Sequence, residues 1–303
     1  MSLFNALIRT SLPVTPKPLI RFFAKRYVAG TTIEDAVATV KRLQREGCCA
    51  TMDVLGESVT NRELAHSAVE LYLQVLDAIE EHSLDANVSL KPTQMGLALD
   101  EAFCLECIGT IVEKAWAKKV FVRIDMEDSP TTDATLRVFR KLDERFPRGS
   151  GVVLQSRLRR TLQDAVELAR DQVNVRLCKG IYLEPRPIGY MESDIIRNNF
   201  MHVLEVLFAG GSYVGVATQD EWLVCETIAM ANRMGVTGSG YEFQMLLGVD
   251  PELRRILTRA GHRLRVYVPF GTHWYPYSVR RLRENPTIAR AGLEAFLRGR
   301  VES

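Results

Sequence analysis

Two adjacent arginines stand near an aromatic residue and an acid in the segment GTHWYPYSVRRLREN, residues 271–285. On a helix, Tyr277, Arg280, Arg281 and Glu284 follow the i, i+3, i+4, i+7 spacing and share one face. Guanidinium groups hold a carboxylate through paired, charge-assisted hydrogen bonds, so this face could bind a carboxylate ligand. A solvent-facing helix with an Arg280–Glu284 salt bridge, worth roughly 0.2–0.5 kcal/mol, explains the same spacing. The residues alone leave both interpretations open.

Polar residues of both charge signs end most of the short apolar runs in the rest of the chain. They are Asp53, Lys91, Asp125 with Glu127, Gln155, Arg176 with Lys179, Thr218 with Gln219, Glu242 with Gln244, and Tyr267. Acids and bases that meet inside one ring are typical of a site for a small charged ligand. The alternative for each residue is a structural ion pair under the loops. Lys91 and Lys179 could also form a Schiff base, as a barrel lyase would need.

The elements that must position these residues are predicted from eight apolar runs of strand length. They span residues 48–56, 87–91, 120–126, 151–156, 173–179, 212–218, 241–246 and 264–271. Segments with helical periodicity separate them, and this alternation is typical of a (β/α)8 barrel of about 250 residues. A doubly wound α/β fold usually has a G-x-G-x-x-G turn after its first strand, and the sequence contains no such motif. We therefore expect an α/β barrel over residues 47–303, preceded by an N-terminal helical arm over residues 1–46.

Four helical segments carry more detailed predictions. Thr60 and Glu63 are predicted to form a capping box at the start of the helix over 61–82, and Thr218 with Glu221 predicts a second one. The inward-facing stripe of the 61–82 helix is predicted at Leu64, Ala68, Leu71, Val75 and Ile79. The stripe over 161–171 is predicted at Leu162, Ala165, Val166 and Ala169. The helix over 192–209 should end at Gly210 and Gly211.

The composition excludes several classes of protein. With 39 basic and 37 acidic side chains in 303 residues, the net charge of +2 supports neither an acidic disordered chain nor a nucleic-acid partner. No apolar run approaches the roughly 20 residues of a membrane span, and prolines interrupt the N-terminal apolar stretch, which argues against a secretory signal. The histidines and the lone C-x-x-C of Cys104 and Cys107 lack metal-site spacing. We therefore expect no metal and buried, reduced thiols in a cytoplasmic protein.

A local excess of positive charge lies at the N-terminus. Residues 1–33 contain Arg9, Lys17, Arg21, Lys25 and Arg26 and no acid. A solvated helical arm is the ordinary explanation. The alternative is peripheral contact with anionic lipid on the inner face of the cytoplasmic membrane, to which each basic side chain would contribute about 1 kcal/mol.

Several motifs of the chain resemble, in order, those of the proline dehydrogenase family. YPYSVRRLREN is similar to the family's Y-x-x-R-R-x-x-E element. Further similar blocks are RYVAGTTIEDA (26–36), MDVLGES (52–58), SLKPTQMG (89–96), VRIDME (122–127), VVLQS (152–156), VRLCKGIYLEP (175–185) and YEFQMLLG (241–248). The resemblance is to the monofunctional bacterial form. It implies a distorted (β/α)8 TIM barrel that holds FAD non-covalently. It also implies oxidation of L-proline to Δ1-pyrroline-5-carboxylate, with hydride transfer from proline C5 to flavin N5 and electrons passed to a membrane quinone.

The resemblance also implies roles for individual residues. Asp125 would lie close to the reacting centre, and Arg176 near flavin N5. The substrate-binding residues would be Lys91, Tyr267, Tyr277, Arg280, Arg281 and Glu284, with Lys91 paired to Glu284. The FAD contacts would be Met126, Gln155, Lys179, Gly180, Ile181, Tyr182, Thr218 and Gln219, with Leu177 close by. Gln219 stands where the family commonly has His; it keeps a hydrogen bond but cannot stack or carry charge as His does.

Two other classes of function stand beside this flavin-dependent dehydrogenase. One is a Schiff-base barrel lyase that uses Lys91 or Lys179. The other is a catalytically silent barrel that binds a carboxylate ligand or partner.

Overall fold

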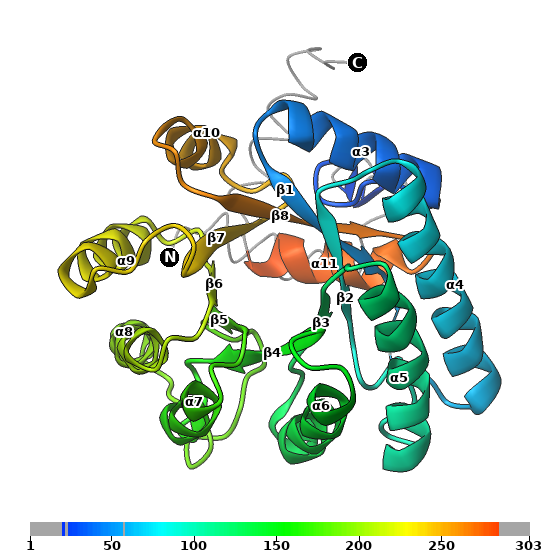
Figure 1. Cartoon of the computed structure of the whole chain (residues 1–303), viewed down its shortest axis with the longest axis horizontal. Coiled ribbons are helices and arrows are strands. Elements are labelled where there is room, and N and C mark those ends of the chain that lie inside the picture. The colour runs from blue at the N-terminus through cyan, green and yellow to red at the C-terminus, as the bar shows by residue number, and fades with distance from the viewer. Residues whose placement is uncertain (1–19, 22–23, 57, 285–303) are drawn as a thin grey trace.

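The computed structural model describes residues 20–21, 24–56 and 58–284, and the side chains of 282–284 lie outside the described part. Within it, eight parallel strands close into a barrel in chain order, with β8 returning to pair with β1 (Figure 1). The strands are β1 Cys49–Val54, β2 Ala86–Leu90, β3 Val122–Ile124, β4 Ser150–Gln155, β5 Val175–Cys178, β6 Val214–Ala217, β7 Tyr241–Leu246 and β8 Leu264–Phe270. The predicted barrel is confirmed, and each strand lies inside its predicted run or within one residue of it.

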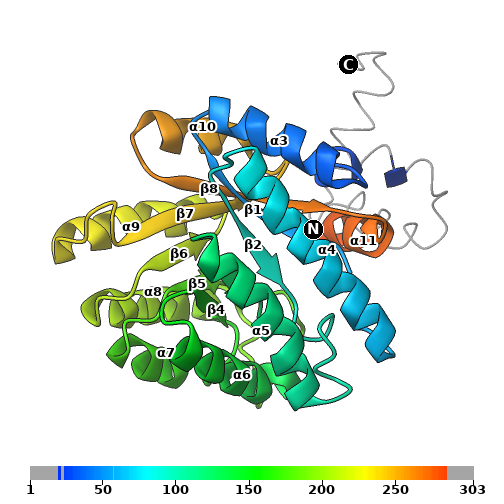
Figure 2. The ribbon, with the colours of Figure 1, turned by 45° about the vertical axis from the view of Figure 1, so that its right-hand side comes forward.

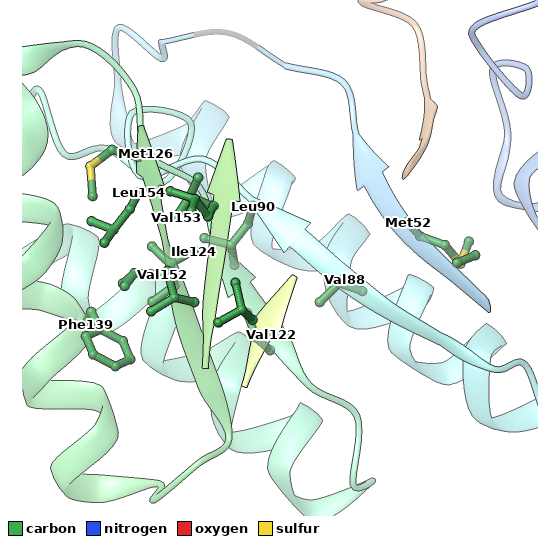
Figure 3. Packing of buried hydrophobic residues seen from close by; sticks show 14 of the residues in the cluster. Met52, Val88, Leu90, Val122, Ile124, Met126, Phe139, Val152, Val153 and Leu154 are labelled. Carbon is green, nitrogen blue, oxygen red and sulfur yellow. The ribbon is translucent and has the colours of Figure 1, made fainter. Parts of the chain in front are cut away.

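Helices between the strands form the outer layer of the barrel. They are α4 Arg62–Glu81, α5 Glu101–Ala117, α6 Thr132–Arg145 after the short η2 Ser129–Thr131, α7 Thr161–Arg170, α8 Ser193–Ala209, α9 Glu221–Met234 and α10 Pro251–Arg259. Because a helix covers the outer face of the sheet, its strands read as nearly continuous apolar runs. Figure 3 shows this layer on β3 and β4, where Phe139 of α6 lies near Val152.

The first and last described helices depart from a regular barrel. Helix α3, Ile33–Arg45, packs against β1 and β8, although it lies in the segment that we assigned to the N-terminal arm. Helix α11, Trp274–Glu284, follows β8 and lies across the carboxyl ends of the strands (Figure 2). The helix that follows the last strand is thus placed over the mouth of the barrel, and α3 takes the outer position beside β8 and β1.

For α4, the predicted buried stripe is partly wrong and the predicted N-terminal cap is wrong. Leu64 is 50% exposed, and the buried face is formed by Ala65, Val69 and Tyr72 together with the predicted Val75 and Ile79. Tyr72 must face inward because its hydroxyl donates to Ser89 O at 2.6 Å and accepts from Val54 N at 3.2 Å. The N-cap is Asn61, whose side chain accepts from Leu64 N at 2.9 Å, and the predicted Thr60–Glu63 box is therefore wrong.

Two other helical predictions are corrected and one is confirmed. In α7, Leu162 and Val166 are each 38% exposed, so the buried face is narrower than the apolar pattern suggested. Helix α9 begins after Asp220, and Thr218 accepts from Asp220 N at 3.0 Å in a turn before the helix, so the second predicted capping box is wrong. Helix α8 ends at Gly210, as predicted.

The cysteine prediction is confirmed for the C-x-x-C pair. Cys104 and Cys107 are free, buried thiols on α5. Among the described residues, no group of three His, Cys, Asp or Glu side chains could hold a metal ion. No described helix is long and apolar enough to cross a membrane.

Candidate active site

A cavity of about 280 Å³ lies at the carboxyl ends of the strands, where α11 crosses the barrel. Catalytic residues of barrel enzymes come from the ends of several strands at this face. The predicted site residues that line the cavity are Lys91, Asp125, Met126, Gln155, Arg176, Gly180, Ile181, Tyr182, Gln219, Tyr267, Tyr277, Arg280 and Arg281. Barrel closure therefore brings together residues that are almost 200 positions apart in the sequence.

A neighbouring hollow of about 420 Å³ holds two other predicted residues, Lys179 and Thr218. The hollow shares Ala217 and Gln219 with the main cavity, so the two spaces adjoin. Asp220 in this hollow is held by Lys179 and by Arg197, whose Nε lies 2.7 Å from the carboxylate.

The α11 residues form the cavity wall away from the strands. Tyr277 is 8% exposed, and the Arg281 guanidinium lies 5.5 Å from the centre of its ring. Burial raises the pKa of Tyr277 to about 12. Within the described residues, Tyr277 Oη and Arg280 Nε are buried without a hydrogen-bond partner. Buried polar atoms are normally paired, so these two atoms must find partners outside the described side chains. Glu284 ends α11, and its side chain lies outside the described part.

Lys91 is held by carboxylates from two other strands. Its Nζ lies 3.0 Å from Asp53 Oδ1 and 4.0 Å from Asp125 Oδ2. Burial lowers the pKa of Lys91, but the two carboxylates outweigh that effect and raise the pKa above its ordinary value. A Schiff base requires a neutral amine, and a lysine held in its charged form is poorly suited to the lyase alternative.

Asp125 and Arg176 form a second ion pair in the cavity. Arg176 Nη1 donates to Asp125 Oδ1 at 2.8 Å, and Ser89 Oγ donates to the same oxygen at 2.7 Å. Tyr267 contacts both partners: its hydroxyl lies 3.5 Å from Asp125 Oδ2, and the Arg176 guanidinium lies 5.5 Å from its ring centre. Side chains from β2 and β8 thus hold an ion pair that itself joins the end of β3 to β5.

Gly180 follows Lys179 in a left-handed turn, with φ of +91°. A Cβ at this position would lie 2.9 Å from Gln155 Oε1, so a side chain would be strained both by the backbone and by its neighbour. The backbone of the turn can consequently approach a ligand closely.

The cavity also contains residues that the sequence did not single out for a role. They are Glu127, Val153, Cys178, Ala217, Gln244, Met245 and Leu246. The apolar ones resemble core residues, and their only signal was their place at a strand end. Glu127, Gln244 and Asp53, the fully buried partner of Lys91, lie at strand ends as predicted but had no predicted role. Glu242, which was predicted at the same end as Gln244, lies instead at the amino end of β7. Leu177 alternates with the inward-facing Arg176 and belongs to the apolar core.

The charge of the cavity lining favours an anion. Four lining side chains are cationic and two are acidic. Of the acids, Glu127 accepts at both carboxylate oxygens from Thr93, by its backbone N at 2.9 Å and its hydroxyl at 2.6 Å. Asp125 is paired with Arg176. A small ligand that carries a carboxylate fits this arrangement.

Comparison with known proteins identifies the family. The model of the proline dehydrogenase family matches residues 36–291. Proline dehydrogenase 1 of Bacillus subtilis is 37% identical over 278 residues, 92% of each chain. The proline dehydrogenase of Deinococcus radiodurans is 33% identical over 280 residues, 91% of this chain and 90% of that protein.

Solved structures agree on the fold. Proline utilization A from Bdellovibrio bacteriovorus, inactivated by N-propargylglycine, matches with a TM-score of 0.81 at 22% identity. The match covers 87% of this chain and 32% of that longer one. The chain therefore belongs to the proline dehydrogenase family, a family of flavoprotein oxidoreductases whose activity is the oxidation of proline to Δ1-pyrroline-5-carboxylate.

Proposed function

We propose that the cavity binds L-proline by its carboxylate beside a bound FAD, and that the electrons pass to a membrane quinone. One observation carries the proposal: the α11 arginines and Tyr277 enclose, with Lys91, Asp125 and Arg176, a cavity in which four of the six charged lining side chains are cationic. Proline presents a carboxylate on a small apolar ring, and the wall offers guanidinium groups beside aromatic rings.

The residues at the strand ends suit FAD. The cavity and the neighbouring hollow adjoin, and together they fall in the range of about 300–1,000 Å³ that is usual for cofactor sites. Gly180 allows close approach of the backbone, and Gln155, Gln219 and Thr218 offer polar side chains. Met126, Ile181 and Tyr182 would contact the flavin, and Lys179 would lie beside the cofactor. When bound, FAD supplies the hydride acceptor, N5 of its flavin ring.

The substrate end of the cavity would hold proline by residues from α11 and the strands. Arg280 and Arg281 would bind the carboxylate through paired hydrogen bonds, with Lys91 beside them. Tyr267 and Tyr277 would enclose the ring and keep its reacting carbon in one position, since positioning contributes much of the rate of such a transfer. Glu284 would pair with Lys91, as the resemblance implies.

Charge in the cavity would also prepare the substrate and stabilise the product state. The positive side chains favour the neutral form of the proline amine, so the amine would release its proton to solvent water and no dedicated base would be needed. Arg176, held on Asp125, would place a cation where negative charge develops after hydride transfer.

The direct test is optical. The purified protein should be yellow, or become so after incubation with FAD, and anaerobic L-proline should bleach its flavin absorbance. A short-chain quinone added to the bleached protein should restore the colour. A protein that stays colourless with FAD contradicts the proposal, and covalent trapping of a keto acid by borohydride would support the lyase in its place.

We also propose that the part of residues 1–46 that precedes helix α3 is an arm that brings the barrel to the inner face of the cytoplasmic membrane. Arg21, Lys25 and Arg26 are exposed, whereas Arg9 and Lys17 lie outside the described residues. Binding to anionic vesicles should weaken as salt is added, because exposed charges are screened. Equal binding to neutral and anionic vesicles would contradict an electrostatic role.

A further inference from the structure

Gln244 of β7 connects the Arg176 side chain to the polar interior of the barrel. It is 6% exposed and lines the main cavity. Its Oε1 accepts from Arg176 Nε at 2.6 Å, and its Nε2 donates to Glu242 Oε1 at 2.7 Å. Both ends of the amide are therefore used.

Glu242 fixes which end of the amide faces Arg176. Burial raises the pKa of Glu242, but Arg265 and its other partners outweigh that effect and lower the pKa, so the carboxylate is ionised. Arg265 Nε lies 2.6 Å from Glu242 Oε1, and Arg263 Nε lies 3.2 Å from Oε2. An ionised carboxylate only accepts hydrogen bonds, so the NH2 group of Gln244 must face it. The carbonyl oxygen of Gln244 then points to Arg176.

Gly215 of β6 supplies the space for this contact. The strand register places Gly215 between Arg176 of β5 and Glu242 of β7. A Cβ on Gly215 would lie 2.3 Å from Gln244 Nε2 and 2.8 Å from its Cδ. Since real Cβ atoms do not approach so closely, alanine at this position would displace the Gln244 amide.

We propose that Gln244 is a positioning residue for Arg176. The Glu242–Arg265 ion pair orients its amide, and the absence of a side chain at Gly215 leaves the space that the amide occupies. Arg176 is then held at two points, by Gln244 at Nε and by Asp125 and Ser89 at Nη1. The catalytic consequence rests on the proposed function, in which Arg176 lies beside the reacting atoms. The hydrogen bond between Gln244 and Arg176 involves only protein side chains and does not depend on that function.

The hydrogen bond from Arg176 Nε to Gln244 is tested first, by NMR of the arginine Nε–H groups in the purified protein. The Arg176 signal, assigned by its loss in Arg176→Lys, should be protected from solvent exchange in the wild type. Gln244→Met and Gly215→Ala should each shift that signal and remove its protection. In Gln244→Glu an acceptor for Arg176 remains, so the protection should persist although a second carboxylate beside Glu242 lowers stability. If Gln244→Glu keeps the protected signal although it is destabilised, loss of the signal in Gln244→Met reflects loss of positioning and not loss of stability.

The catalytic consequence is tested by kinetics and by the flavin midpoint potential. Gln244→Met should lower kcat for proline oxidation by about 10- to 100-fold with KM little changed, because a loosened Arg176 acts on the reaction and not on carboxylate binding. The midpoint potential should become more negative, and Gln244→Glu should retain more activity than Gln244→Met. Asn199→Leu is the matched control: it removes a buried amide that donates to Ser156 O outside the barrel interior, and should leave kcat and potential unchanged.

Two outcomes would overturn the proposal. One is a Gln244→Met protein whose Arg176 signal keeps its position and protection; the other is a wild-type kcat and potential in a variant that has lost the signal. A wild-type protein that binds no FAD contradicts the proposed function instead, and the NMR comparison still decides whether Gln244 holds Arg176.

Discussion

At the amino ends of the strands, Glu242 is enclosed by Arg265 and Arg263, whereas at the carboxyl ends four cationic and two acidic side chains line one cavity. The Arg265 side chain at the amino end is also satisfied by Ala50 O at 2.7 Å. At the carboxyl end, Tyr277 Oη and Arg280 Nε are buried, and among the described residues they have no hydrogen-bond partner. Arg265 and Glu242 are therefore paired with each other at the amino end, whereas α11 at the carboxyl end carries buried polar atoms that no described residue pairs with.

This difference indicates that the side chains at the amino end mainly stabilise the fold, whereas those at the carboxyl end mainly bind a ligand. A buried ion pair that loses one partner leaves an uncompensated charge, which is costly. A buried donor without a partner already carries a desolvation cost that a ligand can relieve. Substitutions at the amino end should thus act mainly on folding, and those on α11 mainly on substrate affinity.

The largest expected effect is at the amino end. Arg265→Met removes the main partner of Glu242 and should lower the free energy of unfolding by about 3–5 kcal/mol. Urea denaturation monitored by far-UV circular dichroism measures it. An unchanged midpoint would mean that Arg265 and Glu242 contribute no more than a surface pair.

Arg281→Ala should separate binding from stability at the other end. Loss of a charged hydrogen bond to the substrate should raise KM for proline by about 10- to 100-fold, with FAD retained. Steady-state kinetics and the flavin absorbance of the purified variant measure both quantities. Loss of FAD with unchanged proline affinity would contradict the proposed carboxylate site.

Acid should weaken the amino-end pair. Because the folded-state pKa of Glu242 lies below its ordinary value of 4.5, ionised Glu242 stabilises the protein above that value. The contribution is lost as pH falls through the lower folded-state pKa. The difference in unfolding free energy between wild type and Glu242→Gln should accordingly shrink below about pH 4.5, as denaturation at a series of pH values would measure. A difference that is constant with pH would assign the effect to packing.

The smallest effect is expected in the outer layer, away from both ends. Asn61→Ala removes the α4 cap and should cost about 1 kcal/mol of stability with KM for proline unchanged. Thr60→Ala is the matched control and should change stability by no more than about 0.5 kcal/mol. Thermal unfolding measures the stability of the two variants. An equal loss of stability in both would favour the Thr60–Glu63 capping box predicted from the sequence.

The periodicity of the sequence was enough to predict the barrel, because strand length and apolar runs are local properties. It was not enough to fix the phase of α4. Apolar residues lie on two adjacent faces of that helix, and the choice of Ala65 over Leu64 follows from Tyr72, whose hydroxyl must reach Val54 and Ser89. Likewise, the Y-x-x-R-R spacing places Tyr277, Arg280 and Arg281 on one helix face, but only the packed structure sets that face over the cavity.

The sequence by itself determined the eight strands, the order of the motifs and the residue types available at the strand ends. The tertiary structure decided which of those residues meet. Asp53 holds Lys91, and Gln244 holds Arg176, across strands that are distant in sequence. Local sequence specifies the period and the buried face of an element, whereas pairing across the barrel depends on strand register, closure and the space that a residue such as Gly215 leaves open.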